Sequence, residues 1–277
     1  MYEVITLIIL AIVWMIFAVI QDLKTREVSN WLNFSLIVFA LGFRFFYSLF
    51  SSPLNFNFFY SGLIGLGVFF VLGNMFYYSR VFGGGDAKLL ISLGTILPFS
   101  LNFKENLWIF GWFMLIFLFV GSVYGLCWSV YLAVKNSKKF KKEFLKLIKE
   151  NKLIVIVSSL IGMIIAIFGV IDLMFFLLGI FIILISYLYF FAKSIDGCCM
   201  TIDVSSKRLR EGDLLFKDLK FGKKIIKSDW EGLSLKDIKF ISKHFKNVKI
   251  KQGIPFVPVF LISFFILIYL FFRGNII

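Results

Sequence analysis

The chain has 277 residues, of which 60% are hydrophobic, and a formal net charge of +14. Its mean hydropathy of +0.92 excludes an ordinary soluble globular protein, so we expect an all-α polytopic membrane protein. The charge is concentrated in residues 135–152, with 8 Lys against 2 Glu, and in 192–253, with 15 Lys or Arg against 8 acidic residues. Two effects account for both stretches: cationic loops stay in the cytoplasm, and they are attracted to anionic lipid headgroups. We therefore expect membrane lipid, and no nucleic acid, among the partners.

Eight apolar segments are candidates for transmembrane helices, each of which needs about 20 mainly apolar residues. They cover residues 4–20, 31–50, 58–78, 88–101, 107–134, 153–170, 173–191 and 254–272. The first segment lacks the basic start and the small-residue cleavage site of a signal peptide, so we expect it to be retained. An N-terminus outside the cell places most Lys and Arg residues on the cytoplasmic side.

Two polar stretches interrupt the apolar segments. The stretch "KKFKKEFLKLIKEN" (138–151) has apolar residues at helical spacing among its lysines and predicts an amphipathic helix on the membrane surface. Residues 192–253 predict a small cytoplasmic α+β domain, with Ser234 capping a helix in "SLKDIKFISKHF" and a strand in "NVKIKQ". We thus expect a membrane domain over 1–191, a basic domain over 192–253 and the last transmembrane helix within 254–277.

The scarcity of His and Cys excludes several reaction classes. His244 is the one histidine, so an HExxH metalloprotease and a Ser-His dyad both lack their parts. The cysteines are Cys127, Cys198 and Cys199. They have no CxxC spacing, so we expect reduced thiols and no metal site. Lys88 and Ser92 have the spacing of a Ser-Lys nucleophile pair, but a lysine at a helix start near the headgroups is more typical of an anchor.

Carboxylates near the membrane remain as candidates, because an ionisable group in a transmembrane segment is costly without a partner or a function. Asp22 ends the first segment in "IQDLKTREVSNW", and Asp86 opens the fourth in "GGGDAKLL". The expected topology puts both on the cytoplasmic side. Asp172, Asp196 and Asp203 lie in loops or in the polar domain, where we expect solvated side chains.

Gly83, Gly84 and Gly85 directly precede the second of these acids. Without a Cβ atom they permit positive φ and the close approach of another backbone, which suits a site that admits a peptide. An interhelical loop in which Asp86 caps the next helix is an equally good interpretation. The composition leaves both interpretations open.

Both acidic motifs resemble those of one protease family. Gly83-Gly84-Gly85-Asp86, followed by "AKLL", resembles the GxGD motif of the intramembrane aspartyl proteases, in its type IV prepilin peptidase branch. The stretch "QDLKTREVSNWL" resembles the segment with the first catalytic aspartate in archaeal-type prepilin and preflagellin peptidases. "LREGDLL" (209–215) and "GIPFVPVF" (253–260) also resemble stretches of archaeal members.

The resemblance implies an aspartic endopeptidase in which Asp22 and Asp86 jointly supply acid and base, without a metal or cofactor. The resemblance also implies that further motif residues support the site, namely Gly83, Gly84, Gly85 and Lys88. The implied substrate is a prepilin or preflagellin-like protein, whose short basic leader is cut at the cytoplasmic face of the cell membrane. Whether that protein is a pilin, a flagellin-like protein or another leader-bearing protein stays open, as does the oligomeric state.

Methylation is not expected. Bacterial prepilin peptidases carry paired CxxC motifs that are associated with N-methylation of the trimmed pilin, whereas residues 22–30 of this chain contain no Cys. The resemblance therefore implies cleavage alone.

The segment before the last apolar helix is a candidate for substrate binding, by analogy with the proline-containing motif of presenilin-type proteases. Its residues are Gly253, Ile254, Pro255, Phe256 and Pro258. A plain helix start with proline in its first turn is the alternative interpretation.

Two other classes of protein fit the same carboxylates. A proton- or cation-coupled transporter uses carboxylates within the membrane to carry its ions. A structural membrane protein would tolerate the loss of either acid.

Overall fold

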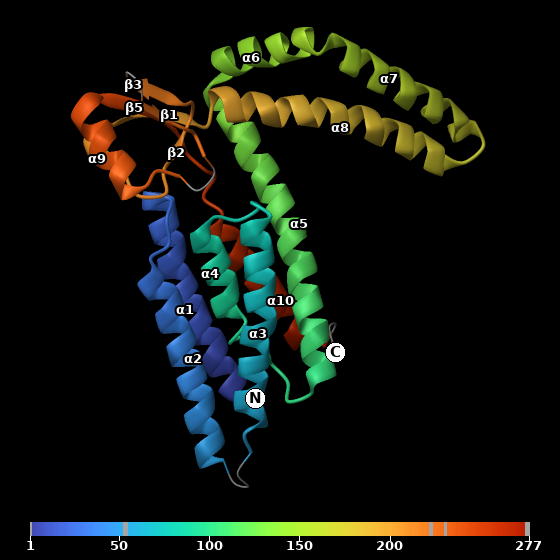
Figure 1. The fold of residues 1–277 in the computed structure, drawn as a ribbon. Coiled ribbons are helices and arrows are strands. Elements are labelled where there is room, and N and C mark those ends of the chain that lie inside the picture. The colour runs from blue at the N-terminus through green and yellow to red at the C-terminus, as the bar shows by residue number, and fades with distance from the viewer. Residues whose placement is uncertain (1, 52–54, 222–223, 230–231, 275–277) are drawn as a thin grey trace. The chain divides into compact units, whose positions relative to one another are not determined.

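The computed structural model describes residues 2–51, 55–221, 224–229 and 232–274 (Figure 1). Contacts divide the chain into two packed units, of which the first comprises Met1–Gly125 and Ile254–Ile277 and the second Leu126–Gly253. Each unit has hydrophobic clusters of its own. The boundary at 191/192 separates apolar from polar sequence rather than packed units, and it stays a prediction.

The first unit is a bundle of helices that run side by side in Figure 1. They are α1 (Tyr2–Thr25), α2 (Asn30–Phe50), α3 (Asn57–Tyr78), α4 (Gly84–Leu93), α5 (Phe103–Lys135, which continues into the second unit) and α10 (Val257–Phe272). Helix α1 packs against α2 and α10, and α4 packs against both α2 and α3. Phenylalanines of α5 contact α3 through the Phe69–Phe110 pair and α10 through the Phe117–Phe260 pair.

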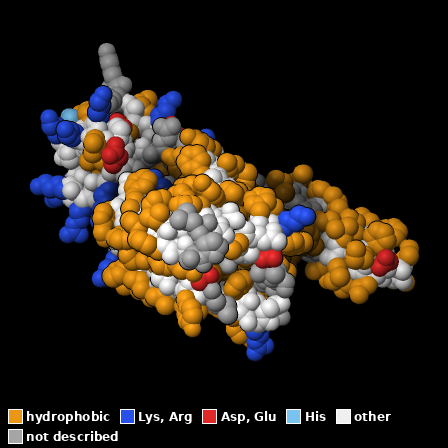
Figure 2. All heavy atoms as spheres, turned by 90° about the horizontal axis from the view of Figure 1, so that it is seen from below, with side chains coloured by type: hydrophobic (Ala, Val, Ile, Leu, Met, Phe, Trp, Pro, Cys, Tyr) orange, Lys and Arg blue, Asp and Glu red, His pale blue; other side chains and the backbone are white. Residues whose placement is uncertain are grey.

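In the described part of the chain, six helices are long and apolar enough to span a membrane. They are α1, α2, α3, α5, the stretch Lys152–Val170 and α8 (Leu173–Cys198). Large hydrophobic side chains are exposed along these helices, and Figure 2 shows such side chains over much of the visible surface. Such a surface suits lipid and not water. The chain is therefore a multi-pass membrane protein.

The predicted count of eight transmembrane helices is not confirmed. The segment predicted over 88–101 forms only the ten-residue α4, which ends at Leu93. Ten residues rise about 15 Å, half of the roughly 30 Å hydrocarbon core. Residues 94–102 are not helical. Gly94 and Pro98 disfavour continuation of the helix, and apolar composition alone does not report this.

The helical part of the second unit is a hairpin with an additional amphipathic helix. Its elements are α6 (Ser137–Glu150), α7 (Lys152–Ile167), η1 (Phe168–Val170) and α8. Helix α6 confirms the predicted amphipathic helix, and its aromatic residue Phe140 packs against Phe191 of α8. Helices α7 and α8 meet backbone to backbone at Gly162 and Gly179, because a Cβ on either glycine would collide with the other's carbonyl.

The strands of the second unit form a three-stranded antiparallel sheet in the order β1-β5-β2 and a separate β3–β4 hairpin. The elements are β1 (Thr201–Ser205), η2 (Ser206–Arg208), β2 (Leu214–Leu215), β3 (Leu219–Phe221), β4 (Lys224–Ile226), α9 (Leu235–His244) and β5 (Asn247–Lys251). The predicted helix and strand are confirmed as α9 and β5. Ser234 caps α9 and forms a capping box with Asp237.

Candidate active site

Asp22 lies in the last turn of α1 and is 5% exposed. Its Oδ2 accepts a hydrogen bond of 2.9 Å from the backbone N–H of Val257, and its carboxylate also accepts from the N–H of Phe256. These two N–H groups belong to the first turn of α10, where they have no partner within the helix. A carboxylate is favoured there, because the N-terminus of a helix carries a partial positive charge. Asp22 thus joins the end of α1 to the start of α10.

Asp86 is the third residue of α4, after the N-cap residue Gly83. Its carboxylate accepts a hydrogen bond from the Gly83 N–H, and the side chain is partly exposed. The negative charge of Asp22 acts on Asp86, so the two carboxylates lie within electrostatic reach of each other. The structure therefore places a doubly hydrogen-bonded, buried Asp22 and a partly exposed Asp86 within electrostatic reach of each other.

Contacts with α2 and the α1–α2 loop hold the first two turns of α4 in place. Lys88 Nζ donates to Asn30 Oδ1 at 2.7 Å. A Cβ atom on Gly85 would lie 3.4 Å from the backbone nitrogen of Val28, and Asn33 Nδ2 lies 3.5 Å from the Gly85 carbonyl oxygen. The backbone beside Asp86 thus packs closely against the loop that follows Asp22.

The three glycines adopt a different conformation from the one considered in the sequence analysis. Gly83 has φ −69° as the N-cap residue, and Gly84 and Gly85 are the first two helical residues of α4. The possibility of positive φ is wrong for all three, because the described glycines with positive φ lie elsewhere in the chain. A backbone approach is present at Gly85, beside Val28. Asp86 is not the N-cap residue of the second interpretation, which is Gly83, but its carboxylate accepts a hydrogen bond from the Gly83 N–H.

Left-handed backbone occurs instead at two arginines. Arg26 has φ 60° and Arg80 has φ 63°, each just after a helix, α1 and α3 respectively. A residue with positive φ is common at this position, because it reverses the chain and satisfies the last carbonyls. The Arg26 N–H accordingly donates to the Asp22 carbonyl at 2.9 Å, and the positive charge of Arg26 acts on the Asp22 carboxylate.

The segment before α10 fits both of its interpretations. Gly253 is exposed, Ile254, Phe256 and Pro258 are partly exposed, and Pro255 is buried. A proline lies in the first turn of α10, as the alternative required. The Phe256 ring also packs against Phe82 and Phe117, close to Asp22. A role of this segment in substrate binding stays a prediction.

The Ser-Lys pair is not formed. The Lys88 ammonium is engaged with Asn30, and the Ser92 hydroxyl is fully buried and donates to the Leu89 carbonyl at 2.8 Å. No cluster of His, Cys, Asp or Glu that could hold a metal ion is found among the described residues.

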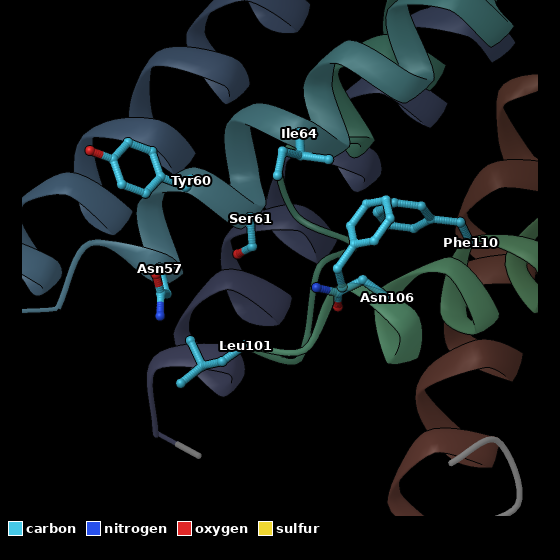
Figure 3. A pocket seen from close by; sticks show the side chains of 8 residues that line it. Asn57, Tyr60, Ser61, Ile64, Leu101, Asn106 and Phe110 are labelled. Carbon is cyan, nitrogen blue, oxygen red and sulfur yellow. The ribbon is translucent and has the colours of Figure 1, made fainter.

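The pocket in Figure 3 lies far from the two acids. Its lining residues are Asn57, Tyr60, Ser61, Ile64, Leu101, Phe103, Asn106 and Phe110. Four of these belong to the first two turns of α3, whereas Asp86 follows the last turn of that helix. The 22 residues of α3 extend about 33 Å, so the pocket is separate from the acids.

We expect Gly85→Val to reduce any activity of the two acids by about 100-fold, the order that a misplacement of about 1 Å produces. Its side chain would push against the Val28 backbone and shift the turn that carries Asp86. Gly42→Val is the matched control, because a Cβ on Gly42 meets nothing within 4 Å. Equal rates for the two purified variants would contradict the close packing at Gly85.

Comparisons with known proteins converge on one family. Residues 9–130, which include both aspartates, match the type IV leader peptidase family. The preflagellin peptidase of Methanococcus maripaludis is 33% identical over 84 residues, which are 30% of this chain and 35% of the relative. The preflagellin peptidase of Methanococcus voltae is 28% identical over 149 residues, 49% of this chain and 63% of the relative.

The preflagellin peptidase of Methanocaldococcus jannaschii is 31% identical over 90 residues, 32% of this chain and 37% of the relative. Each match thus covers less than two thirds of the relative's length. No solved structure matches the chain significantly. Residues 9–130 of the chain thus match the type IV leader peptidase family, and the three relatives to which the chain is similar are preflagellin peptidases.

Proposed function

We propose that this chain is an aspartic endopeptidase of the cell membrane that removes the short basic leader of a prepilin or preflagellin-like protein. The observation that carries the proposal is that Asp22 and Asp86 lie within electrostatic reach of each other, in the part of the chain that matches the family. The printed function of the three relatives, preflagellin peptidase, supports this substrate class.

The proposed reaction uses the two carboxylates as one unit. One carboxylate takes a proton from a water molecule, whose oxygen forms the new bond to the scissile carbonyl carbon. The other, protonated, gives its proton to the amide nitrogen as the C–N bond breaks. Two close carboxylates can share one proton in this way, and their titration belongs to the pair. We therefore assign Asp22 and Asp86 jointly.

The surroundings of the acids differ in a way that suits this division of labour. The two N–H groups at the start of α10 hold Asp22 in one orientation, away from solvent. Asp86 is partly exposed, and its carboxylate accepts a hydrogen bond from the Gly83 N–H. Contacts at the start of α4 support the backbone of this acid. They are made by Gly83, Gly84, Gly85 and Lys88.

For the orientation in the membrane we propose an N-terminus outside the cell and both acids at the cytoplasmic face. The excess of Lys and Arg in 135–152 and 192–253 supports this orientation, because cationic segments stay in the cytoplasm. The basic segment 192–253 repels a basic leader, so its role stays open among contact with anionic lipid, with the enzyme's own loops and with acidic groups of the substrate.

The transporter alternative receives no support from the comparisons. All three relatives reported above are peptidases by name. A transporter would lose ion flux on substitution of either acid and leave leader processing unchanged.

Complementation in cells tests the function. The chain should restore processing of the preflagellin in a methanogen strain that lacks its own preflagellin peptidase, seen as a shift of the substrate to its mature mass. Expression of the chain in the membrane without any processing would contradict the proposal.

We expect the trimmed substrate to keep a free N-terminal amine, because residues 22–30 lack the cysteine motifs associated with methylation. The measurement is the intact mass of the product after incubation with enzyme and a methyl donor. A mass increase of one methyl group that requires this chain would show that it methylates as well.

A further inference from the structure

The end of the short helix α4 leaves buried backbone carbonyls inside the first unit without helical hydrogen-bond partners. After its end at Leu93 the chain continues without helix through 94–102, although Thr95, Ile96 and Leu97 are fully buried. Carbonyl groups in such a stretch have no helical partners, and lipid offers none. Non-helical backbone at membrane depth is tolerated only where protein groups satisfy it.

Arg44 of α2 supplies the missing donors. Its guanidinium is 0% exposed, and it donates to the carbonyl oxygens of Thr95 at 2.8 Å, Ile96 at 3.2 Å and Pro98 at 2.7 Å. The same group donates to the Phe58 carbonyl at 2.9 Å and the Ser61 hydroxyl at 3.1 Å, both at the start of α3. Five bonds match the five N–H donors of a guanidinium.

The acceptors around this cation are neutral. In the part of the chain that the structure describes, no ion pair includes Arg44. The carbonyls that it binds follow the C-terminal end of α4, where the helix dipole favours a positive charge. A lysine cannot replace the arrangement, because its three donors on a point charge lack the planar fork of arginine.

Glycines of α3 make room for this contact. A Cβ atom on Gly62 would lie 2.5 Å from Arg44 Cδ, so a larger residue at position 62 would require the arginine side chain to move. A Cβ atom on Gly65 would collide with the carbonyl oxygen of Gly94. The end of α4 is therefore fixed between α2 and α3 with little freedom to slide.

We propose that Arg44 is a positioning residue that sets the depth and direction of α4 and, through this rigid ten-residue helix, the place of Asp86 opposite Asp22. Helix α2 then holds α4 at both ends, with Arg44 beyond its C-terminus and Asn30 at Lys88 in its second turn. The importance of Asp86 rests on the function proposed above, whereas the positioning of α4 does not.

Two cysteine crosslinks measure the positioning without any cleavage assay. Both are made in the full chain with Cys127, Cys198 and Cys199 changed to Ser. The first pair, Asn30→Cys with Lys88→Cys, reports the contact of α2 with α4. The second pair, Trp14→Cys with Ser35→Cys, replaces a 2.9 Å hydrogen bond between α1 and α2 and reports bundle packing that does not involve α4. A membrane-permeant oxidant or a short bismaleimide forms the crosslinks.

Each pair is combined with one of three substitutions. Arg44→Met removes the donors, and Gly62→Ala displaces the guanidinium while keeping its charge. Gly67→Ala is the matched control on the same helix, because a Cβ there meets nothing within 4 Å.

We expect the yield of the 30/88 crosslink to fall several-fold with Arg44→Met and with Gly62→Ala. It should stay unchanged with Gly67→Ala. The yield of the 14/35 crosslink should stay unchanged in all three variants. In the variants without added cysteines, kcat for leader cleavage should fall by about 100-fold with little change in KM. An unchanged 30/88 crosslink in Arg44→Met or Gly62→Ala would overturn the proposal, and so would a parallel loss of both crosslinks in both variants. A chain that cleaves no leader but shows the expected crosslinks would overturn the proposed function alone.

Discussion

Asp22→Asn and Asp86→Asn should each lower the rate of leader cleavage by about 10²–10⁴-fold, the usual contribution of a positioned acid or base. Asparagine keeps the shape of the side chain, and at position 22 its oxygen can still accept the Val257 N–H, so the bundle should remain intact. The amide cannot take or give a proton at the pH of the assay. Half of the pair therefore cannot supply both acid and base.

The measurement is a rate of cleavage for each purified variant, with circular dichroism and elution volume as tests of folding. Asp203→Asn is the matched control, because Asp203 is exposed on β1 in the polar part of the second unit. Near wild-type cleavage by a folded Asp22→Asn or Asp86→Asn variant would remove that residue from the mechanism.

The second large effect concerns a backbone group. Val257→Pro removes the N–H that donates to Asp22 Oδ2, and a hydrogen bond to a charged group contributes about 1.5–3 kcal/mol. We expect cleavage to fall by about 10–100-fold, which is that free energy converted to a rate ratio. Val257 is the first residue of α10 and its N–H has no helical partner, but Phe256 before it has αR backbone (φ −103°, ψ −15°), which a following proline disfavours, so the fold of this variant is checked by circular dichroism.

Val257→Ala separates this effect from packing. Alanine keeps the N–H but removes part of a fully buried side chain, which should lower thermal stability with a smaller loss of rate. The two variants are compared by kcat/KM and by Tm. Equal losses of rate in both would mean that the valine side chain, and not its N–H, matters for Asp22.

Local sequence signals predicted much of the molecule. The lysine-rich amphipathic helix and the Ser234 cap follow from spacing within a few residues, and the structure confirms both. The two aspartate motifs are also local, and they lie within the region that matches the family. Each of these features depends on neighbours in the chain, so the sequence contains the information directly.

Features that depend on distant contacts were not predicted. The N–H of Val257 meets Asp22 across 235 positions of the chain, and no local pattern indicates it. The helix expected over 88–101 ends at Leu93, and Arg44 of another helix satisfies the carbonyls that follow it. Arg44 is itself a signal in the sequence, since an ionisable residue within an apolar segment is a functional candidate, but no local pattern indicates which carbonyls it binds.

The run Gly83-Gly84-Gly85 is compatible with two different local structures. Freedom to adopt positive φ and a need for close packing both favour glycine. Only the second applies at Gly85, whose neighbour is the Val28 backbone. The left-handed conformation occurs instead at Arg26 and Arg80, each just after the end of a helix, a position that usually favours glycine.

The central claim is that this chain cuts a leader peptide with its two aspartates. Purified chain in lipid vesicles is incubated with a leader-bearing preflagellin, and the intact masses of both products are measured over time. The account predicts one cut between the leader and the hydrophobic helix, made by the wild-type chain and absent with Asp86→Asn. An uncut substrate, in an assay where the Methanococcus voltae preflagellin peptidase cuts the same protein, would contradict it.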